Sequence, residues 1–481
     1  MKTIGETMKK DLWINGRWVP TEQTLTIHSP FDGHLVGEVS VATSSQVSLA
    51  IDAAERTRPA MRALSAYERG EILDRVAELF DKRRHEAAAI LCAEAAKPLN
   101  AALAEIDRTV QTYHFAADEA RRLSGEMIPI DAAPGGKGRF GFTIQEPLGI
   151  IAAITPFNFP FNLVAHKIGP AFAGGNTVVL KPASQTPFSA FFTAELFHDA
   201  GLPAGALNVV TGSGAVVGDV LVEDERIAMV TFTGSPPVGK AIKAKAGLKK
   251  VTLELGSNSA VIIDQGVDID TLIDRCVVGA FSFQGQVCIS LQRIFVHSSL
   301  YADLCQKMVI ATKKLNGGQP DKATTDYSAL ISEKDADRVQ QWIKTAEDDG
   351  ATVLCGGERT GNMVSPAILT NVAKGLKVSC QEVFGPVVVI WPFDELGDAI
   401  DQVNDSVYGL QAGIYTPLLD NALHAAKKLE VGGVMINDIP TFRVDQMPYG
   451  GVKESGTGRE GLHYAVTEMT EMKLVVVKPS T

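Results

Sequence analysis

The feature that most constrains the fold is a series of short, β-branched apolar runs that begins at Gly149. Each run is the length of one strand and apolar on both faces, which is typical of strands buried inside a parallel sheet. The segments between them are long enough for crossover helices, and Phe188, Phe192 and Leu196 share one helical face in one of these segments. The pattern predicts a doubly wound α/β domain. The runs are GIIAAIT, NTVVLKP, LNVVTG, AMVTFTG, KVTLELG and SAVIID.

A helical region precedes these runs, and a second α/β region follows them. In the first 120 residues, Glu68 to Ala89 is the clearest helix, because Ile72, Val76 and Leu79 lie on one face. From about Gly256 onward the chain has strand candidates and a core of its own. These candidates are QRIFVH, TVLCG, PVVVIWPF and GGVMIND. We therefore assign residues 1–123 and 147–255 to one α/β domain and 256–454 to another.

Two strand-like segments fit neither core. Residues 124–146 are rich in Gly and Pro and end in a strand-like stretch, and residues 470–481 contain MKLVVVK. Exposed β edges of this kind are commonly paired with another chain. We expect both segments to make the contacts of a homodimer or homotetramer.

Composition narrows the class of protein. The formal net charge of -11 favours solubility and argues against binding to nucleic acid or an anionic membrane. No stretch is apolar for long enough to span a membrane, and the N-terminus lacks the apolar core of a signal peptide. The six cysteines form neither a dense disulfide framework nor a CxxC pair. We expect a cytoplasmic protein with reduced thiols and no metal site.

Seven short segments together resemble the aldehyde dehydrogenase superfamily. They are TPFNFP at 155–160, KPASQTP at 181–187, FTGSPPVGK at 232–240, LELG at 253–256, FQGQVC at 283–288, EVFGP at 382–386 and PYGGVKESGTGRE at 448–460. They occur in the family's order, and the resemblance runs from about residue 12 to the end. It implies a Rossmann-like NAD(P)-binding domain, an α/β catalytic domain, a β oligomerisation arm and the oxidation of an aldehyde. Non-acylating semialdehyde, lactaldehyde, phosphonoacetaldehyde and non-phosphorylating glyceraldehyde-3-phosphate dehydrogenases are similar.

Cys288 and Asn158 match the family's nucleophile and oxyanion donor. Oxidation of an aldehyde by hydride loss first needs a tetrahedral carbon, which a thiolate supplies by adding to the carbonyl. Cys288 is the only cysteine in a Gly- and Gln-rich turn, although a buried packing role is the alternative. The resemblance pairs the side-chain amide of Asn158 with the backbone N–H of Cys288 as oxyanion donors. Asn158 could instead cap the helix that follows it, and both roles could hold at once.

Glu254 matches the family's general base for hydrolysis of the thioester that forms on Cys288. It ends an apolar strand, so partial burial should raise the pKa of its carboxyl group. An acid at a strand end is otherwise usually a solvated surface residue. By resemblance, Lys167 and Glu460 relay the proton outward.

The cofactor site lacks a standard dinucleotide fingerprint, because no GxGxxG follows the first strand of this sheet. The resemblance places the pyrophosphate at Gly234 and Ser235, where a strand ends and a helix begins. It places Lys181 at the adenine ribose, Glu382 at the nicotinamide ribose and Phe384 near the nicotinamide. Further cofactor-binding positions are Ile154, Thr155, Pro156, Phe157, Ser184, Gly214 and Val238.

Four positions depart from common family residues. Phe157 replaces a common Trp but keeps the aromatic bulk, and Ser257 and Asn258 replace a frequent Gly and Lys. Ser184 stands where members that prefer NAD commonly carry an acidic residue. Without that carboxylate, a 2′-phosphate meets no repulsion and Lys181 can help to bind it. We therefore predict that NADP is accepted, and leave open whether it is preferred over NAD.

The residues assigned by resemblance to the aldehyde tunnel are mostly small or polar, which argues against a fatty aldehyde. They are Phe159, Asn162, His166, Ser282, Val287, Ile289 and Arg443. Arg108 lies on a helix that contributes a second arginine in relatives that use anionic substrates, and two guanidinium groups can hold an anion. A further arginine of those relatives is Val287 here, which favours a small or singly charged group such as a semialdehyde carboxylate. Alternatively, Arg443 pairs with Asp445 or another acid as ordinary surface structure.

Two other functions compete with hydrolytic aldehyde oxidation. In a CoA-acylating aldehyde dehydrogenase, CoA releases the thioester and no water-activating carboxylate is required, so the presence of Glu254 favours hydrolysis. A catalytically silent structural or ligand-binding member is the other alternative. The combination of Cys288, Asn158, Glu254 and Glu382 argues against it.

Overall fold

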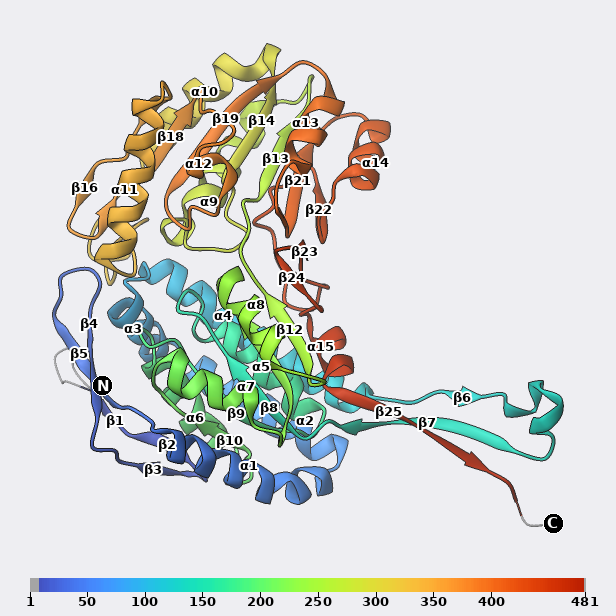
Figure 1. Ribbon diagram of the computed structural model, residues 1–481. Coiled ribbons are helices and arrows are strands. Elements are labelled where there is room, and N and C mark those ends of the chain that lie inside the picture. Colours follow the sequence, from blue (N-terminus) through green and yellow to red (C-terminus); the bar gives the residue numbers. More distant parts are fainter. Residues whose placement is uncertain (1–7, 480–481) are drawn as a thin grey trace.

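The computed structural model describes residues 8–479, and in them the chain forms two α/β domains and a long β arm (Figure 1). The expected domain assignments also include residues 1–7 and 480–481, which lie outside the described residues. No helix within residues 8–479 is long and apolar enough to cross a membrane.

The first domain is built on an eight-stranded sheet whose five central strands are parallel. Its order is β24 (Gly456–Thr457), β12 (Lys250–Glu254), β11 (Ile227–Thr233), β8 (Ile150–Ile154), β9 (Thr177–Lys181), β10 (Leu207–Val209), β2 (Leu12–Ile14) and β3 (Arg17–Val19). The five central strands are five of the six apolar runs expected from the sequence. The sixth, SAVIID, forms β13 in the second sheet instead. A separate three-stranded sheet near the N-terminus contains β1 (Met8–Lys10), β5 (Leu35–Ser40) and β4 (Thr24–His28).

Helices cover both faces of the first sheet, which confirms the expected doubly wound architecture. Alternate residues of β8 belong to different cores: Ile151 packs with one set of helices and Ile150 with the other. The first set is α2 (Ala66–Lys82), α3 (Arg84–Ala95), α4 (Leu99–Arg122), α5 (Asn162–Ala173), α6 (Phe188–Asp199) and α15 (Leu462–Glu468). The second is α1 (Ser44–Ala63), η3 (Gly214–Gly218), α7 (Asp219–Glu223) and α8 (Pro236–Lys245).

The helix expected over Glu68 to Ala89 is two helices. The backbone leaves the helical conformation at Arg83, with φ -105° and ψ 21°, so that α2 ends and α3 begins on either side of this residue. The apolar spacing of Ile72 and Val76 did place one face of α2 in the core. It could not reveal the break, because both helices bury apolar residues against the same cluster.

The second domain contains a seven-stranded sheet that is parallel except for one edge strand. Its order is β15 (Thr352–Cys355), β18 (Ala367–Thr370), β19 (Val387–Phe393), β14 (Arg293–His297), β13 (Ala260–Ile263), β21 (Gln411–Tyr415) and β22 (Gly433–Ile436). The helices of this domain are η4 (Ile269–Thr271), α9 (Ile273–Phe281), η5 (Ser282–Gly285), α10 (Ser298–Thr312), α11 (Glu333–Asp348), α12 (Lys377–Cys380), α13 (Leu396–Asn404) and α14 (Leu419–Lys428). Two small β pairs are β16 (Arg359–Thr360) with β17 (Met363–Val364), and β20 (Tyr408–Gly409) with β23 (Val452–Lys453).

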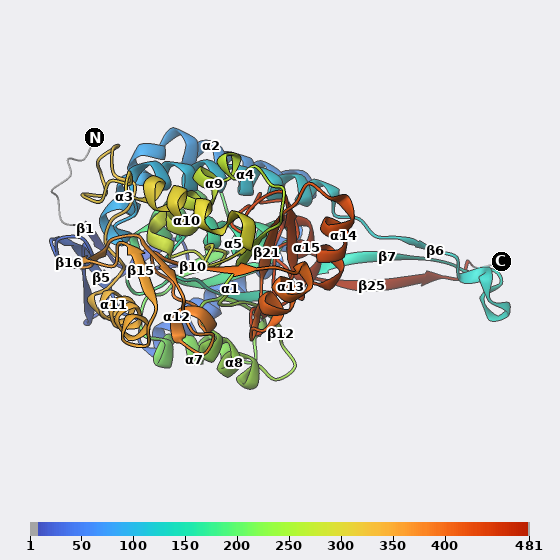
Figure 2. The ribbon, with the colours of Figure 1, turned by 90° about the horizontal axis from the view of Figure 1, so that it is seen from above.

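The two strand-like segments that fit neither core pair with each other and project from the body (Figure 2). β7 (Phe140–Pro147) is antiparallel to β25 (Thr470–Val477), and β6 (Met127–Ile128) pairs with the other edge of β7. The short helices η1 (Ile130–Ala132) and η2 (Pro134–Gly136) connect β6 and β7. The arm therefore joins parts of the sequence more than 300 residues apart.

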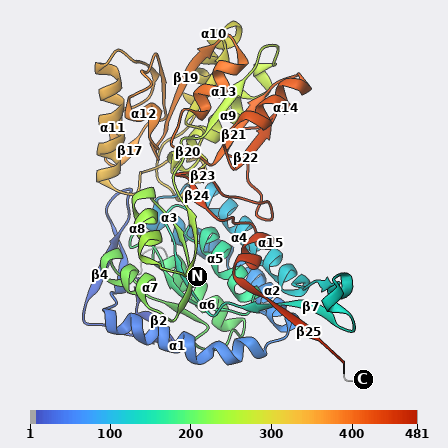
Figure 3. The ribbon, with the colours of Figure 1, turned by 45° about the vertical axis from the view of Figure 1, so that its right-hand side comes forward.

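The two domains meet where several strands of the first sheet end. β23 and β24 lie between the two sheets in the rotated view (Figure 3). β24 pairs with the end of β12, so that Gly456 lies opposite Glu254. The C-terminal segment that carries these strands thus returns from the second domain to the edge of the first.

Candidate active site

Cys288 follows a turn whose backbone is forced close to a neighbouring loop. Phe283, Gln284 and Gly285 all have positive φ values, of 47°, 54° and 70°. A Cβ atom on Gly285 would lie 2.2 Å from the backbone oxygen of Gly385, so only glycine fits there. The Cys288 Sγ atom lies 2.7 Å from the Tyr449 hydroxyl. Burial raises the pKa of the Cys288 thiol to about 11, which opposes formation of the thiolate.

Asn158 lies beside the same turn and does not cap the following helix. Its Nδ2 atom donates to the backbone oxygen of Gln286 at 3.0 Å, two residues before Cys288. The first amides of α5 donate to a carboxylate oxygen of Glu105 instead, from Phe161 at 2.9 Å and from Asn162 at 3.2 Å. The capping role considered for Asn158 is therefore wrong, because Glu105 supplies the acceptor from another helix.

Lys97 holds the segment around Asn158 in place. Its side chain is completely buried, and its Nζ atom donates to the backbone oxygen of Asn158 at 2.6 Å and to Glu105. The same ammonium lies 4.0 Å from the ring centroid of Phe159 and 4.3 Å from that of Phe283. Lys97 thus connects the segment that carries Asn158 with the turn that precedes Cys288.

Glu254 ends β12 as a buried carboxyl group with 3% of its surface exposed. Neither of its oxygens has a hydrogen-bond partner among the described residues. Burial, followed by repulsion from Glu460, raises the pKa of Glu254 well above its ordinary value. Glu254 is therefore not a solvated strand-end acid. Its Oε1 atom lies 2.9 Å from where a Cβ on Gly450 would be, next to Tyr449.

Glu460 is buried between two cations. Lys167 Nζ lies 3.0 Å from one of its oxygens, and Arg443 Nη2 lies 2.9 Å from the other. Burial would raise the pKa of Glu460, but Lys167 and Arg443 outweigh it and hold this pKa well below its ordinary value. The structure thus places Glu460 with Lys167, as the relay hypothesis requires, and adds Arg443.

The two arginines assigned to substrate binding pair with different acids. Arg443 pairs with Glu460 and not with Asp445, and its guanidinium lies 3.7 Å from the ring centroid of Tyr449. Its side chain is only 6% exposed, so it is not ordinary surface structure, and its Nε atom has no hydrogen-bond partner among the described residues. Arg108 pairs with Asp445 through two hydrogen bonds, of 2.6 and 3.2 Å.

Asp445 also holds two of the other residues assigned to the tunnel. Asn162 Nδ2 donates to it at 3.0 Å, and His166 Nε2 lies 2.9 Å from the same oxygen. Burial, followed by repulsion from Arg443, lowers the pKa of His166. The remaining tunnel positions lie near Cys288: Phe159, Val287 and Ile289 are in the apolar cluster that contacts it, and Ser282 begins η5.

The residues assigned to the adenosine end of the cofactor lie where β8, β9 and β11 end. Thr155 follows β8, and its hydroxyl is buried without a partner among the described residues. The same holds for Thr233, which ends β11 and was not among the expected cofactor positions. Lys181 ends β9, and burial lowers its pKa to about 8. Ser184 is partly buried, and its hydroxyl lies 3.5 Å from the Gly212 oxygen.

The expected pyrophosphate position precedes α8. Ser235 is the N-cap residue, but Pro236 and Pro237 begin the helix and carry no N–H. The first helical amide is therefore that of Val238, whose side chain is exposed. Gly214 begins η3, and a Cβ atom there would meet nothing within 4 Å. The turn offers fewer amides to an anion than a strand-to-helix turn without prolines.

The residues assigned to the nicotinamide end meet between the two domains. The Ser257 backbone N–H donates to Glu382 at 3.0 Å, and desolvation raises the pKa of Glu382 to about 7. The rings of Phe384 and Phe157 lie edge to face, with centroids 5.8 Å apart. The aromatic bulk kept at position 157 thus contacts the EVFGP segment, and Ser257 contacts it through its backbone.

Comparisons with known proteins agree over nearly the whole chain. The profile described as the aldehyde dehydrogenase family matches residues 18–475. The chain belongs to this family. It is 45% identical over 477 residues to 3-sulfolactaldehyde dehydrogenase from Priestia aryabhattai, which covers 99% of this chain and 100% of that protein.

Two solved structures share the fold closely. Aldehyde dehydrogenase 21 from Physcomitrella patens, in complex with the reaction product succinate, has a TM-score of 0.96 and 39% identity, with 98% of each chain covered. NADP-dependent glyceraldehyde-3-phosphate dehydrogenase from Bacillus halodurans, complexed with NADP, has a TM-score of 0.95 and 37% identity, covering 98% of this chain and 99% of that chain. The protein is an NAD(P)-dependent aldehyde dehydrogenase, and the expected fold class is confirmed.

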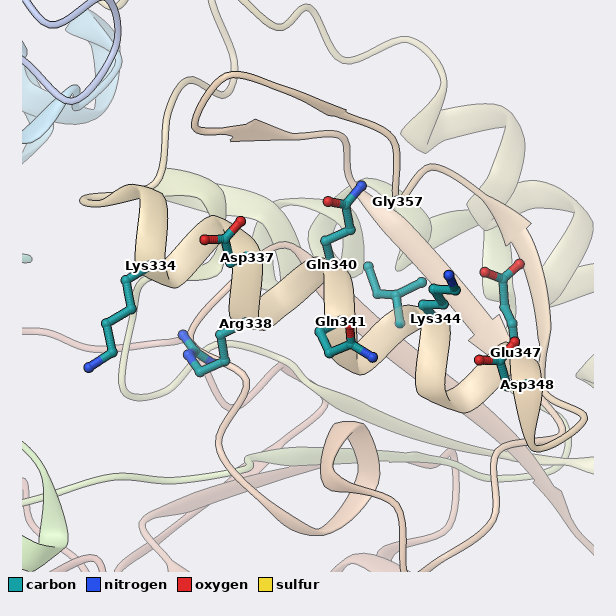
Figure 4. A pocket seen from close by; sticks show the side chains of 10 residues that line it. Lys334, Asp337, Arg338, Gln340, Gln341, Lys344, Glu347, Asp348 and Gly357 are labelled. Atoms are coloured by element: carbon teal, nitrogen blue, oxygen red, sulfur yellow. The ribbon is translucent and has the colours of Figure 1, made fainter.

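The residues of this aldehyde dehydrogenase fit NAD(P) at both ends. The unpartnered hydroxyls of Thr155 and Thr233 and the ammonium of Lys181 offer polar groups to an adenosine moiety. Glu382 offers a carboxylate that can accept hydrogen bonds from a ribose. A pocket on the outer side of α11, shown in Figure 4, contains none of these residues. Its lining includes Lys334, Asp337 and Arg338.

Sequence reasoning missed three residues at the centre of this aldehyde dehydrogenase site. Tyr449 contacts the Cys288 thiol, Lys97 holds the backbone of Asn158, and Asp445 binds three of the residues assigned to the tunnel. Tyr449 lies within the PYGGVKESGTGRE motif, where its hydroxyl group could have indicated a polar role. Lys97 gave no comparable signal, because charged residues are usually exposed, and Asp445 was considered only as a surface partner of Arg443.

Proposed function

We propose that this aldehyde dehydrogenase oxidises a small anionic or polar aldehyde to its carboxylic acid through a thioester on Cys288. One observation carries the proposal: a cysteine thiol, a tethered side-chain amide and an unpartnered buried carboxyl group gather where the two domains meet. The amide of Asn158 binds the oxygen of Gln286, beside Cys288. Glu254 lies beside Gly450, and the adjacent Tyr449 contacts the Cys288 thiol.

The proposed reaction begins with addition of the Cys288 thiolate to the aldehyde carbonyl. The S–C bond forms, and the carbonyl π electrons move to oxygen, where the Asn158 amide and the Cys288 backbone N–H stabilise the charge. NAD(P), when bound, supplies the acceptor for the hydride that the carbon then loses. Glu254 takes a proton from water as the water oxygen attacks the thioester, and the C–S bond breaks to release the acid and the thiolate.

The raised pKa of Glu254 gives this step a defined pH dependence. The base works only when it is ionised, so deacylation accelerates as the pH rises through the raised pKa of Glu254. Glu460 stays ionised over the same range, because Lys167 and Arg443 hold its pKa low. Glu460 is therefore a poor acceptor for the proton that Glu254 takes up, and the outward relay through Lys167 and Glu460 stays a prediction.

The two catalytic roles can be separated by burst kinetics. Glu254→Gln should form the acyl-enzyme, release one equivalent of reduced cofactor per site and then turn over about a thousandfold more slowly. Cys288→Ala should give no burst. The measurement is cofactor absorbance in a stopped-flow instrument, with acid product quantified with and without CoA. Near-normal turnover by Cys288→Ala would overturn the mechanism, and a product formed only with CoA would replace hydrolysis by acyl transfer.

The charges in the site favour a singly charged anionic aldehyde. Arg443 and Lys167 surround one ionised acid, Glu460, while the raised pKa of Glu254 favours its neutral form. The neighbouring cluster is balanced, because Arg108 pairs with Asp445 and the lowered pKa of His166 favours its neutral form. Among these groups, one positive charge is left over while Glu254 is protonated. The relatives named for 3-sulfolactaldehyde and glyceraldehyde 3-phosphate, and the one with bound succinate, also support an anionic substrate.

We therefore propose that Arg443 binds a carboxylate or sulfonate on a short aldehyde. Arg443→Leu should lower kcat/KM for an anionic aldehyde by about 30-fold more than for a neutral aldehyde of equal length, which corresponds to about 2 kcal/mol. Steady-state kinetics on succinic semialdehyde and butyraldehyde would measure this ratio. Equal losses on both substrates would assign Arg443 to its pair with Glu460 alone.

NADP is proposed as an accepted cofactor. Ser184 carries no charge to repel a 2′-phosphate, and Lys181 is close in sequence and available to bind it. The relative from Bacillus halodurans is named as NADP-dependent. The test compares kcat/KM for NADP and NAD in the wild type and in Ser184→Glu, which should shift the ratio toward NAD. A wild-type value for NADP about a thousandfold below that for NAD, some 4 kcal/mol, would contradict the proposal.

We also propose that the arm joins copies of the chain into a cytoplasmic homodimer or homotetramer. Its exposed apolar side chains support this interpretation, because isolated surface ribbons rarely keep so many. They are Phe140, Ile144, Met472, Leu474 and Val476. Light scattering of the wild type and of Leu474→Glu should show a loss of the larger assembly. A monomeric wild type would end the proposal.

A further inference from the structure

Tyr449 places its hydroxyl directly on the proposed nucleophile. Its Oη atom lies 2.7 Å from Cys288 Sγ, and the residue is 2% exposed. The backbone of Tyr449 is held by two hydrogen bonds to Glu460, of 3.0 and 2.7 Å. The inference drawn from this hydroxyl rests on the proposed function, because it takes Cys288 as the nucleophile.

The surroundings fix the ring on more than one side. The Arg443 guanidinium lies 3.7 Å from the ring centroid, and Val287 and Ile289 share the apolar cluster that contains Tyr449. Arg443 is itself held by Glu460. These contacts hold the ring in a position that keeps its hydroxyl group against the Cys288 sulfur. The positive charge of Arg443 also draws electron density from the ring, which makes the O–H group a stronger hydrogen-bond donor.

The direction of the hydrogen bond follows from which group ionises first. Burial raises the pKa of Tyr449 well above its ordinary value, whereas the pKa of Cys288 is raised to about 11. The hydrogen bond from Tyr449 acts in the opposite sense to burial and lowers the pKa of the thiol. A thiolate has no proton to donate, so once Cys288 ionises the phenol must be the donor.

We propose that Tyr449 is a catalytic residue that donates a hydrogen bond to the Cys288 thiolate and makes this partly buried thiol easier to ionise. Tyr449 exchanges no proton: the thiol proton leaves to solvent, and the phenol keeps its own. When the S–C bond forms, the sulfur loses its negative charge and the charge appears on the carbonyl oxygen, beside the Asn158 amide. Tyr449 thus serves the nucleophile before addition, and Asn158 serves the oxyanion after it.

The alternative is that Tyr449 only fills space in the apolar cluster. Phenylalanine would then serve equally well, because it keeps the ring and its contact with Arg443. Tyr449→Phe therefore separates the two roles by removing one oxygen atom. Tyr113→Phe is a matched control, since the Tyr113 hydroxyl is also buried but has no hydrogen-bond partner among the described residues, and its ring packs against Phe80.

The experiment measures the pH dependence of iodoacetamide alkylation at Cys288, followed by peptide mass spectrometry so that the other thiols do not contribute. In Tyr449→Phe the midpoint should rise by about one pH unit, and the pre-steady-state burst at pH 7 should slow about tenfold. Tyr113→Phe should change neither. An unchanged midpoint and burst in Tyr449→Phe, with melting temperature retained, would overturn the role of the hydroxyl.

The Cys288→Ala variant distinguishes failure of this inference from failure of the proposed function. If Cys288→Ala is inactive and Tyr449→Phe leaves the alkylation midpoint unchanged, the inference fails while the proposed function stands. If Cys288→Ala keeps normal turnover, the proposed function fails, and the role of Tyr449 in catalysis fails with it. A raised midpoint together with an inactive Cys288→Ala supports both.

Discussion

Glu105 and Glu254 are two carboxyl groups at the same depth with opposite environments. Glu105 is 1% exposed, and its oxygens accept from two backbone amides of α5 and from Lys97. Glu254 is 3% exposed, and neither of its oxygens has a partner among the described residues. A buried carboxylate with every oxygen satisfied holds structure together, whereas an unsatisfied one is costly and free to bind a proton.

The two carboxyl groups have different roles in the active site. Glu105 and Lys97 hold the chain around Asn158 in place. Glu254, on the other side of the site, keeps its lone pairs for water. The paired charges of Glu105 and Lys97 thus hold the surrounding backbone rigid, while the carboxyl group of Glu254 has no ion pair of its own among the described residues. An active site needs this arrangement to keep a reactive base in position.

Removing Lys97 should have the largest effect on stability. Lys97→Met leaves the Glu105 carboxylate buried with an uncompensated charge, which typically costs about 3 to 5 kcal/mol. Urea denaturation would measure the change in the free energy of unfolding. Lys97→Met combined with Glu105→Gln should recover most of the loss, because the amide oxygen can still accept from α5 without a charge. A loss below about 1 kcal/mol in the single variant would mean that Glu105 is not a structural charge.

Glu254→Gln should have a smaller and pH-dependent effect of the opposite sign. Because the pKa of Glu254 is raised in the folded state, its contribution to stability is complete below the unfolded pKa and is lost as the pH rises through the folded pKa. Each unit of difference between the two pKa values corresponds to about 1.4 kcal/mol. Glutamine does not titrate, so the variant should gain stability relative to the wild type as the pH rises.

Melting temperatures of the wild type and Glu254→Gln from pH 5 to pH 9 would test this sign. The difference should be smallest at pH 5, because the unfolded carboxyl has only begun to ionise there and the folded one is still protonated. The gap should widen with pH in favour of the variant. A constant difference across the range would show that the pKa of Glu254 is not raised in the folded state, and would weaken its assignment as a base.

A surface pair should give the smallest effect and set the scale for the other two. Lys240 and Glu454 lie 2.7 Å apart, but their side chains are 59% and 40% exposed. Water screens such a pair, so Lys240→Met should change the free energy of unfolding by less than about 1 kcal/mol. The same urea experiment serves as the measurement. If Lys240→Met lowered the free energy of unfolding as much as Lys97→Met does, burial could not be the reason for the large effect at Lys97.

The sequence predicted those parts of the fold and site that depend on local pattern. Apolar runs located the five central strands of the first sheet and β13, β14 and β19 of the second, and the motif around Cys288 is the tight turn that its glycine requires. β18 and β21 were not predicted, because β18 is short and β21 contains a glycine and a glutamine in place of a continuous apolar run. The end of α2 at Arg83 was also missed, since the apolar periodicity continues across it.

The partners of charged residues were beyond the reach of the sequence. Arg108 was expected to bind substrate together with Arg443, yet it forms its ion pair with Asp445, 337 positions away. Asn158 was considered as a helix cap, a role that Glu105 fills from another helix. Any acid in the chain was a possible partner until packing brought one within reach.

The sequence alone determined three features: the buried parallel strands, the turn that carries the cysteine and the acidic residue at a strand end. Each of these depends only on residues that are neighbours along the chain. The tertiary structure decided which charges are satisfied. It placed Lys97 against the backbone of Asn158 and Arg443 between Glu460 and Tyr449, and within residues 8–479 it left Glu254 without a hydrogen-bond partner. The energy of a buried charge depends on the atoms within a few ångströms, and only folding sets those distances.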